Sequence, residues 1–176
     1  MGKKRRVAIV GPESSGKTEL SKSLAQEFAE PWAKEMSRPF LESQGGAYAE
    51  SDLLKIAHLQ LEEEARQWSK AKGYLFCDTN LLVIKVWAEW KYQRVDPGLM
   101  SLWKPQQYDL HLLCYPDLPY EDDPLRENPN PKDRIALFER YKTQLTSLKV
   151  PFYLISGTGE SRLKNAKEIL DSHFTS

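Results

Sequence analysis

Cysteine and long apolar runs are both scarce in this chain of 176 residues. The two cysteines, Cys77 and Cys114, each fall near the end of a short apolar run, where free thiols are ordinary core residues. Their spacing suggests neither a disulfide framework nor a metal site, so we expect both to be reduced. No apolar stretch approaches the ~20 residues of a membrane-spanning helix, and the N-terminus lacks the apolar core of a signal peptide. These absences predict a cytoplasmic protein.

An excess of charge of either sign is also missing, because 25 lysines and arginines balance 25 aspartates and glutamates. Such a balance provides no field that attracts nucleic acid or an anionic membrane. A small neutral molecule is therefore the expected partner, and a homo-oligomer stays open. The basic run KKRR at residues 3–6 is interpreted as the solvated start of a strand. Length and the 40% apolar content fit one domain over residues 1–176.

Short apolar runs with β-branched and aromatic residues alternate with longer stretches of helical periodicity. Strands are predicted at residues 6–10, 31–34, 74–77, 109–114 and 151–155. Helices are predicted at residues 15–29, 52–70, 80–92, 135–148 and 160–174. This alternation predicts right-handed crossovers and a five-stranded parallel sheet covered by helices on both faces, which is a three-layer α/β fold.

The strongest motif is GPESSGKT at residues 11–18, which matches G-x-x-x-x-G-K-[ST] between a predicted strand and a predicted helix. Glycines let the backbone turn its N–H groups toward a polyphosphate, and the helix adds its positive N-terminus. Lys17 is then placed to reach the β- and γ-phosphates, and Thr18 to ligate Mg²⁺. A chance match is the alternative. The residues predicted to bind the nucleotide are Gly11, Glu13, Ser14, Ser15, Gly16, Lys17, Thr18 and Glu19.

Two further segments follow predicted strands, at the sheet edge where open α/β folds bind ligands. In KEMSRPF, Glu35 is placed to accept the proton of an acceptor hydroxyl and Arg38 to bridge to the transferring phosphate. A surface ion pair at a helix start is the alternative. In LFCDTN, Asp78 suits Mg²⁺, its waters or a ribose hydroxyl, while a helix N-cap by Asp78 or Thr79 is the competing explanation.

Aromatic residues gather near these segments. Trp87, Trp90 and Tyr92 lie on one predicted helix, and Trp32 comes shortly before Glu35. An aromatic wall suits a flat heterocycle, and core packing is the alternative for each ring. We interpret Trp32 and Trp87 as candidate substrate-binding residues.

The most irregular stretch is residues 114–133, which hold five of the eleven prolines. Segments of this length without regular structure tend to be lids or binding loops, so a lid is predicted at about residues 115–132. Arg126 is its central cation and is expected to stabilise phosphate charge on closure. Its neighbours Asp122, Asp123 and Glu127 are expected to hold it open and solvated until a phosphate binds.

Several segments together resemble a known family, the ribosylnicotinamide kinase domain of NadR-type NAD-salvage proteins and the wider group of small AAA-type P-loop proteins. The resemblance lies in GPESSGKTEL, KEMSRPFLESQGG, IAHLQLEEEA, LFCDTNLLVIKVWAEW, YDLHLLCYPDLPYEDDPLR and VPFYLISG, which follow the family's order over nearly the whole chain. It implies a P-loop NTPase fold of the nucleoside and nucleotide kinase type, with a lid. It also implies ATP and Mg²⁺ as cofactors.

The same resemblance assigns roles to individual residues. Lys17 and Thr18 hold ATP and Mg²⁺, with Asp78 as the second metal ligand. Glu35 and Asp78 face the nucleoside, while Asp122, Asp123 and Arg126 belong to the lid. The catalytic set it implies is Lys17, Glu35, Asp78 and Arg126. With Arg38, Trp32 and Trp87, which are identified from their positions in the sequence, the predicted substrate-binding set is Trp32, Glu35, Arg38, Asp78, Trp87, Asp122 and Asp123.

The chain departs from the family pattern at four places. Met36 replaces a tyrosine, Pro39 a common glutamate, Asn80 an aspartate, and the pair at residues 120–121 reads Tyr-Glu instead of Trp-Val. Glu63 falls near where some members place an aromatic residue against nicotinamide. These departures leave the phosphate-binding residues intact and make the acceptor the open question.

The resemblance implies ATP-dependent phosphorylation of a nucleoside 5′-hydroxyl, with nicotinamide riboside as the leading acceptor. The adenylyltransferase and helix-turn-helix domains of full-length NadR-type proteins have no counterpart in these residues, so a free-standing kinase is expected. A nucleotide-dependent regulator or ligand sensor with little kinase activity is the alternative.

Overall fold

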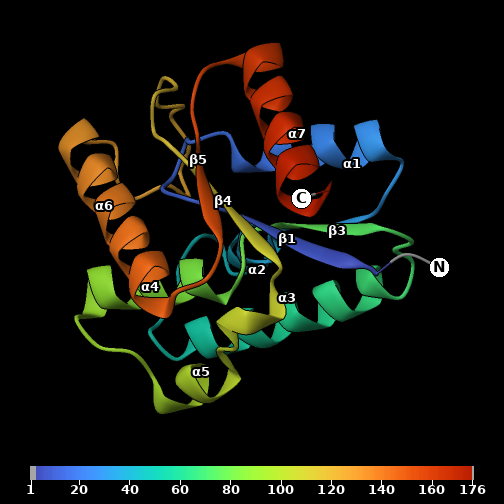
Figure 1. Ribbon diagram of the computed structural model, residues 1–176. Coiled ribbons are helices and arrows are strands. Elements are labelled where there is room, and N and C mark those ends of the chain that lie inside the picture. Colours follow the sequence, from blue (N-terminus) through green and yellow to red (C-terminus); the bar gives the residue numbers. More distant parts are fainter. Residues whose placement is uncertain (1–2, 176) are drawn as a thin grey trace.

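The computed structural model describes residues 3–175, and at its centre lies a five-stranded sheet in which all neighbouring strands are parallel (Figure 1). The strand order is β2-β3-β1-β4-β5. The strands are β1 (Arg5–Val10), β2 (Trp32–Ala33), β3 (Tyr74–Asp78), β4 (Leu110–Cys114) and β5 (Phe152–Ile155). The helices are α1 (Lys17–Phe28), α2 (Ser37–Ser43), α3 (Asp52–Trp68), α4 (Leu81–Tyr92), α5 (Pro97–Leu102), α6 (Pro131–Leu148) and α7 (Gly159–Thr175), with the 3₁₀ helix η1 at Pro105–Gln107.

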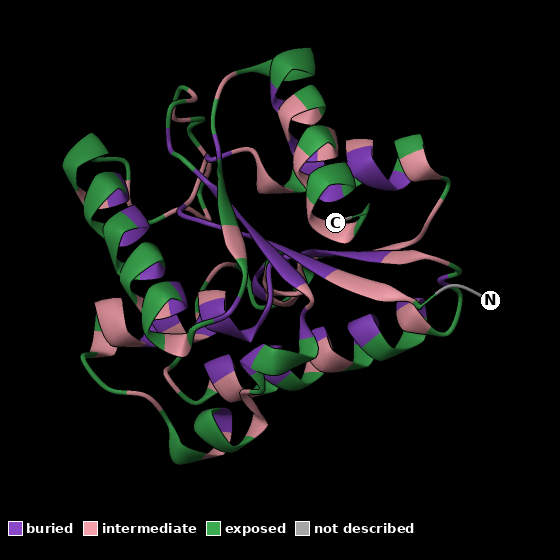
Figure 2. Cartoon of the chain, viewed as in Figure 1, coloured by how far each residue is buried: buried purple, intermediate pink, exposed green. Residues whose placement is uncertain are grey.

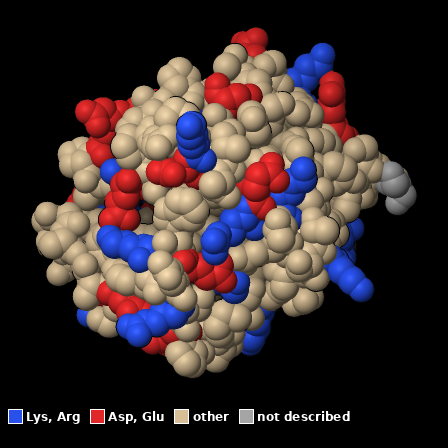
Figure 3. Space-filling model, turned by 90° about the vertical axis from the view of Figure 1, so that its left-hand side faces the viewer, with Lys and Arg blue, Asp and Glu red and all other residues tan. Residues whose placement is uncertain are grey.

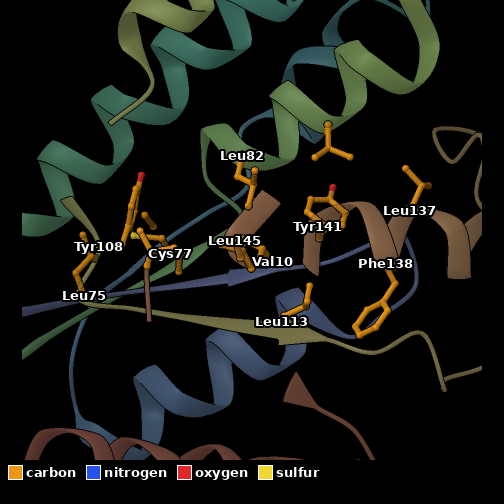
Figure 4. Packing of buried hydrophobic residues seen from close by; sticks show 14 of the residues in the cluster. Val10, Leu75, Cys77, Leu82, Tyr108, Leu113, Leu137, Phe138, Tyr141 and Leu145 are labelled. Atoms are coloured by element: carbon orange, nitrogen blue, oxygen red, sulfur yellow. The ribbon is translucent and has the colours of Figure 1, made fainter. Parts of the chain in front are cut away.

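The sheet is buried between two layers of helices because its strands carry apolar side chains on both faces (Figure 2). Successive residues of β1 point to opposite faces. Ala8 and Val10 join a cluster with residues of α4 and α6, whereas Val7 and Ile9 join a cluster with residues of α1 and α7. Figure 4 shows strand side chains of the first cluster gathered with those of α6. The three-layer prediction is therefore confirmed.

All five predicted strands and all five predicted helices are present, with small shifts at their ends. Helices α2 and α5 and the 3₁₀ helix were not predicted, because each is too short to show a helical period. Helix α6 begins at Pro131, four residues earlier than expected. The Asn130 side chain accepts the N–H of Lys132, and proline suits the first helical position, so this Asn-Pro pair starts the helix and ends the irregular segment.

The two cysteines are free and buried, as predicted. Within residues 3–175, no helix combines the length and the apolar character needed to cross a membrane.

Glu64 on α3 is a buried ionisable residue away from the strand ends. It is 2% exposed, and the Tyr108 hydroxyl donates to its carboxylate at 2.9 Å. Burial raises the pKa of Glu64 to about 7, although Tyr108 and the charge of Arg6 oppose the rise. The folded protein therefore keeps a proton that the unfolded chain, with a glutamate pKa of ~4.3, loses at lower pH.

This difference makes the free energy of unfolding fall as pH rises from ~4.3 toward the folded pKa of about 7. We expect Glu64→Gln to flatten that fall, so that the wild type loses more stability than the variant between about pH 5 and about pH 8. Urea denaturation of both proteins at the two pH values measures the effect. Glu62→Gln, an exposed carboxylate on the same helix, is the control and should follow the wild type. Parallel curves for wild type and Glu64→Gln would contradict the prediction.

Candidate active site

The segment between β1 and α1, residues 11–18, is the phosphate loop. Gly11, Ser14 and Gly16 have positive φ angles of 144°, 52° and 77°, which turn the backbone sharply before α1 begins at Lys17. Because the loop lies at the carboxyl ends of parallel strands and directly before a helix N-terminus, its amides can face an anion. The predicted nucleotide-binding residues Gly11 to Glu19 all line one cavity.

Glycine is required at the start of this loop. A Cβ built on Gly11 would lie 2.7 Å from the carbonyl oxygen of Cys114 at the end of β4 and 3.1 Å from the Ser15 Oγ. The loop thus packs backbone against backbone with the adjacent strand.

Two loop side chains bond to the loop itself. The Lys17 ammonium donates to the Pro12 carbonyl at 2.8 Å, and the Ser15 hydroxyl donates to the same oxygen at 2.7 Å. Lys17 therefore lies across the mouth of the phosphate loop, where it is placed to meet phosphate oxygens.

Asp78 ends β3 beside the first turn of α1. The Thr18 hydroxyl donates to its Oδ2 at 2.7 Å, and its Oδ1 is buried without a hydrogen-bond partner. Burial, reinforced by the charge of Glu35, raises the pKa of Asp78 to about 7, while Thr18 and Lys17 oppose the rise. A buried, half-satisfied carboxylate of this kind is a group that a cation would stabilise.

These two side chains fit a magnesium site. Mg²⁺ is usually held by one or two protein groups, waters and substrate phosphates, not by a cage of side chains. Within residues 3–175, no group of three His, Cys, Asp or Glu side chains is placed to hold a metal ion by itself. Thr18 and Asp78 would be the protein ligands.

Glu35 and Arg38 line the same cavity. The Glu35 carboxylate accepts the Ser37 hydroxyl at 2.6 Å. The segment that carries Glu35 and Arg38 follows β2, which is only two residues long. Its backbone is bonded by a side chain of α3 and not by a neighbouring strand. Gln60 of α3 accepts the N–H of Met36 at 2.9 Å and donates to the carbonyl of Lys34 at 3.2 Å.

The cavity has a volume of about 750 Å³, within the range of small-molecule sites. Besides the phosphate loop, Glu35 and Arg38, it is bounded by aromatic and apolar side chains. These are Leu41, Val83, Trp87, Trp90, Leu118, Pro119, Leu125, Leu137 and Tyr141.

Trp87 therefore lines the cavity as predicted, whereas Trp32 and Asp78 are outside its described lining, and Asp78 reaches the phosphate loop through its bond to Thr18. Within the described residues 3–175 the cavity lining does not include Trp32, which packs against the cluster of α1 and α7 and lies under Lys22 at 5.7 Å. Its position in a two-residue edge strand directs the ring to the face opposite the cavity. Tyr141 was missed, because a single tyrosine on a distant helix carries no local sign of a site.

The predicted lid contacts the phosphate loop directly. The Glu13 carboxylate accepts the N–H groups of Glu127 at 3.1 Å and Asn128 at 2.9 Å, and the Ser14 hydroxyl accepts the N–H of Glu121 at 3.3 Å. Trp90 of α4 donates its indole N–H to the Asn128 side chain at 3.0 Å. Glu13 is thus a tether between loop and lid as well as a cavity residue.

Arg126 lines the cavity, but its partners differ from those expected. Its guanidinium donates to the carbonyl oxygen of Glu121 at 2.8 Å and its side chain is 21% exposed, so it is not an open, solvated charge. Asp123 instead pairs with Arg38 at 2.8 Å, and Asp122 is exposed and outside the described cavity lining.

Glu127, which is also bonded to Glu13 through its N–H, joins a polar cluster with Lys91 and Tyr48. Its carboxylate accepts the Lys91 ammonium at 2.6 Å and the Tyr48 hydroxyl at 2.8 Å. Trp87 donates its indole N–H to the same hydroxyl at 2.9 Å. Lys91 and Tyr48 were missed by the sequence analysis because they are far apart in the chain.

Most of the departures from the family pattern lie outside the cavity lining of the described residues. Asn80 is fully buried, caps α4 by accepting the N–H of Leu82 at 3.0 Å and lies 3.3 Å from the His111 ring. Pro39 is exposed on α2, and Glu63 is bonded to Arg66 and Gln67. Of the changed positions, Glu121 is the one at the cavity.

Figure 3 views the molecule from the side toward which the carboxyl ends of the strands point. Acidic and basic side chains are interspersed over this face, as the balanced composition predicts. The local charges that matter are therefore those inside the cavity.

A phosphate loop at the edge of a parallel sheet, a facing carboxylate and a lid define a P-loop fold of the kinase type, as predicted. The chain belongs to the AAA domain family, whose model matches residues 6–162. Within that family it is a NadR-like P-loop domain. It is 31% identical over 139 residues to the trifunctional NAD biosynthesis/regulator protein NadR of Salmonella typhimurium. This match covers 75% of the chain and 33% of NadR, so the chain spans about a third of that relative's length.

Solved structures agree on the fold. A NadR protein in complex with NAD and AMP-PNP superposes with a TM-score of 0.80 at 18% identity, covering 98% of this chain and 50% of that chain. NadR protein in complex with NR gives a TM-score of 0.73 at 18% identity, with 98% and 52% covered. Deoxyadenosine kinase from M. mycoides gives 0.61 at 13% identity and covers 95% of this chain and 98% of its own.

The tight contact at Gly11 generates a prediction. Gly11→Ala adds a Cβ that overlaps the Cys114 carbonyl and forces a strained φ, so we expect it to lower the free energy of unfolding by about 2 kcal/mol or more. Gly45→Ala, also at positive φ but with nothing near its Cβ, is the matched control and should cost about 1 kcal/mol. Chemical denaturation measures both. Equal losses for the two variants would show that Cys114 does not constrain the loop.

Proposed function

We propose that this domain is a nucleoside kinase that transfers the γ-phosphate of ATP, with Mg²⁺, to a nucleoside 5′-hydroxyl, and that nicotinamide riboside is the leading acceptor. The observation that carries the proposal is that one cavity is lined by the phosphate loop, by Glu35 and by aromatic side chains. A donor triphosphate and a flat acceptor can therefore meet inside it.

The comparisons support this proposal without deciding the acceptor. NadR protein structures hold NAD with AMP-PNP, or NR, and a second structural neighbour is a deoxyadenosine kinase. Since the chain spans a third of the curated NadR sequence, we extend only the kinase activity to it.

The chain's own residues supply positioning and charge. Glu35 is placed to accept the proton of the attacking hydroxyl, and Ser37, which bonds to Glu35, orients that carboxylate. Lys17 and Arg126 both line the cavity and are placed to neutralise phosphate oxygens. Thr18 and Asp78 would hold Mg²⁺, which supplies further charge neutralisation when bound.

The lid excludes water from this reaction. It is bonded to the phosphate loop at two points, where the Ser14 hydroxyl accepts the N–H of Glu121 and the Glu13 carboxylate accepts those of Glu127 and Asn128. Arg126 lies between the bonded residues, so lid closure and phosphate contact involve the same segment.

A nucleoside panel tests the proposal. The protein is incubated with ATP, Mg²⁺ and each nucleoside, and phosphorylated product is measured. We expect product with at least one nucleoside, nicotinamide riboside first, and no acceptor-dependent ADP release without Mg²⁺. If no nucleoside in the panel is phosphorylated, the kinase proposal is wrong.

A second function, a nucleotide-dependent regulator with little kinase activity, is favoured by the tether between Glu13 and the lid. A lid bonded to the phosphate loop can report the bound nucleotide to a partner. Slow, acceptor-independent hydrolysis together with a partner captured only in one nucleotide state would support it. Fast acceptor-dependent ADP release would exclude it.

Lys17→Ala should abolish nucleotide binding and turnover while leaving the fold intact. Lys17 makes its hydrogen bond to Pro12 within the loop and not to the core, so its loss costs little stability. Calorimetric titration with a non-hydrolysable ATP analogue and circular dichroism measure the two effects. Lys22→Ala, an exposed lysine on the same helix, is the control. Unchanged affinity in Lys17→Ala would refute the role.

Glu35→Gln should lower kcat by about 10²–10⁴-fold with little change in nucleotide affinity, because the carboxylate faces the acceptor and not the phosphate loop. Steady-state kinetics and titration with the ATP analogue separate the two effects. Glu42→Gln removes a nearby carboxylate on α2 that is outside the described cavity lining, and it should retain activity. Equal losses of affinity and rate in Glu35→Gln would make Glu35 a structural residue.

A further inference from the structure

Helix α7 contributes a buried arginine to the underside of the phosphate loop. Arg162 is 4% exposed, and its guanidinium makes four hydrogen bonds. It donates to the carbonyl oxygens of Ser15 at 2.7 Å, Tyr115 at 3.0 Å and Gly157 at 2.5 Å, and to the Asp117 carboxylate at 2.9 Å. One side chain therefore bonds to the phosphate loop, to the first residues after β4 and to the loop after β5.

The bond to Ser15 bears on the phosphate loop most directly. A loop that turns its N–H groups toward a ligand turns its carbonyls away from it, and a buried carbonyl needs a donor. Arg162 is that donor for Ser15. The absence of a side chain at Gly16 makes room for Leu118 at the base of the lid, because a Cβ there would lie 2.7 Å from the Leu118 side chain.

The bonds to Tyr115 and Asp117 bear on the lid. These residues directly follow β4 and form the base of the predicted lid, here defined as residues 115–118. Asp117 also accepts the N–H of Gly157 at 2.6 Å, which joins the lid base to the loop after β5. Asp117 supplies the opposite charge that a buried guanidinium requires.

We propose that Arg162 is a positioning residue that fixes the phosphate loop relative to the base of the lid, so that both present their groups to the same phosphates. This inference deepens the proposed kinase function and rests on it for turnover, but not for nucleotide binding. Arg162 is outside the described lining of the cavity and its guanidinium is bonded to three carbonyl oxygens and Asp117, so it acts through the backbone it holds.

An arginine is needed for this arrangement. Its planar fork carries five N–H donors at fixed angles, which can reach acceptors on three segments at once. A lysine has the same charge but only one nitrogen, so it cannot bond to all four acceptors. Arg162→Lys therefore removes the geometry while keeping the charge.

A second buried arginine provides a matched comparison. Arg134 of α6 is also 4% exposed, and it donates to the carbonyl oxygens of Pro116 at 2.9 Å and Leu118 at 3.0 Å. It bonds to the same lid base from α6, whereas Arg162 does so from α7. Among the described residues, the hydrogen bonds of Arg134 do not include the phosphate loop. Arg134→Lys thus loosens the lid base alone.

The test compares Arg162→Lys with Arg134→Lys. Nucleotide affinity is measured by calorimetric titration with AMP-PNP and Mg²⁺, without acceptor, and stability by urea denaturation. We expect both variants to lose stability, but only Arg162→Lys to weaken AMP-PNP binding, by about tenfold or more, with Arg134→Lys within about twofold of the wild type. Arg162→Gly should regain affinity when guanidinium ion is added at low concentration.

Unchanged affinity in Arg162→Lys, or an equal loss in Arg134→Lys, overturns the proposal, since either result makes Arg162 a purely structural residue. If Arg162→Lys does not fold, Asp117→Asn decides instead, because it removes the ion-pair partner and leaves the carbonyl bonds. It should weaken AMP-PNP binding by about twofold to fivefold, and an unchanged value overturns the proposal. Weaker AMP-PNP binding in Arg162→Lys together with an inactive nucleoside panel would remove the kinase function and retain the positioning role.

Discussion

The structure depends on one constraint, which is that the phosphate loop must keep its N–H groups free for a ligand while its carbonyl groups find other partners. The donors to these carbonyl groups come from different parts of the chain. The Pro12 carbonyl is bonded by Lys17 and Ser15 inside the loop, and the Ser15 carbonyl by Arg162 from the last helix. At Gly11, the absence of a side chain lets the loop lie against the carbonyl of Cys114. The central position of β1 in the sheet brings these partners within reach of a loop near the N-terminus.

Ion pairs at the site join helices to the lid. Arg38 is paired with Asp123 of the lid, and Lys91 with Glu127. Asp78 differs, because one of its oxygens is buried without a partner and burial raises its pKa to about 7. A chain with zero net charge can thus still place a buried carboxylate with an unpaired oxygen beside its phosphate loop, where a divalent cation would stabilise the charged form.

The sequence was sufficient to predict the order of strands and helices, the phosphate loop and the carboxylates at the strand ends, because those features are local. It placed Trp32 wrongly relative to the cavity, since a ring next to Glu35 in sequence turns to the other face of the sheet. It also missed Tyr141 and Arg162, which reach the site from helices more than 100 residues beyond the loop. Contacts of this kind depend on the packing of α6 and α7 against the sheet, and no spacing in the sequence encodes them. The partners of Arg126 were mistaken for the same reason. Its sequence neighbour Asp123 pairs with Arg38, while Arg126 itself bonds to the carbonyl oxygen of Glu121.

The two-residue length of β2 has a consequence for how such a domain can change. The side-chain amide of Gln60 makes hydrogen bonds to the backbone on both sides of Glu35, in the way that a neighbouring strand would. The phosphate loop, by contrast, grows from the middle strand of the sheet. Substitutions on α3 can therefore shift the acceptor carboxylate by small steps without disturbing the donor half. The donor half of the site is therefore rigid and the acceptor half is adjustable. A change of acceptor should come from substitutions on α3 before it comes from the phosphate loop.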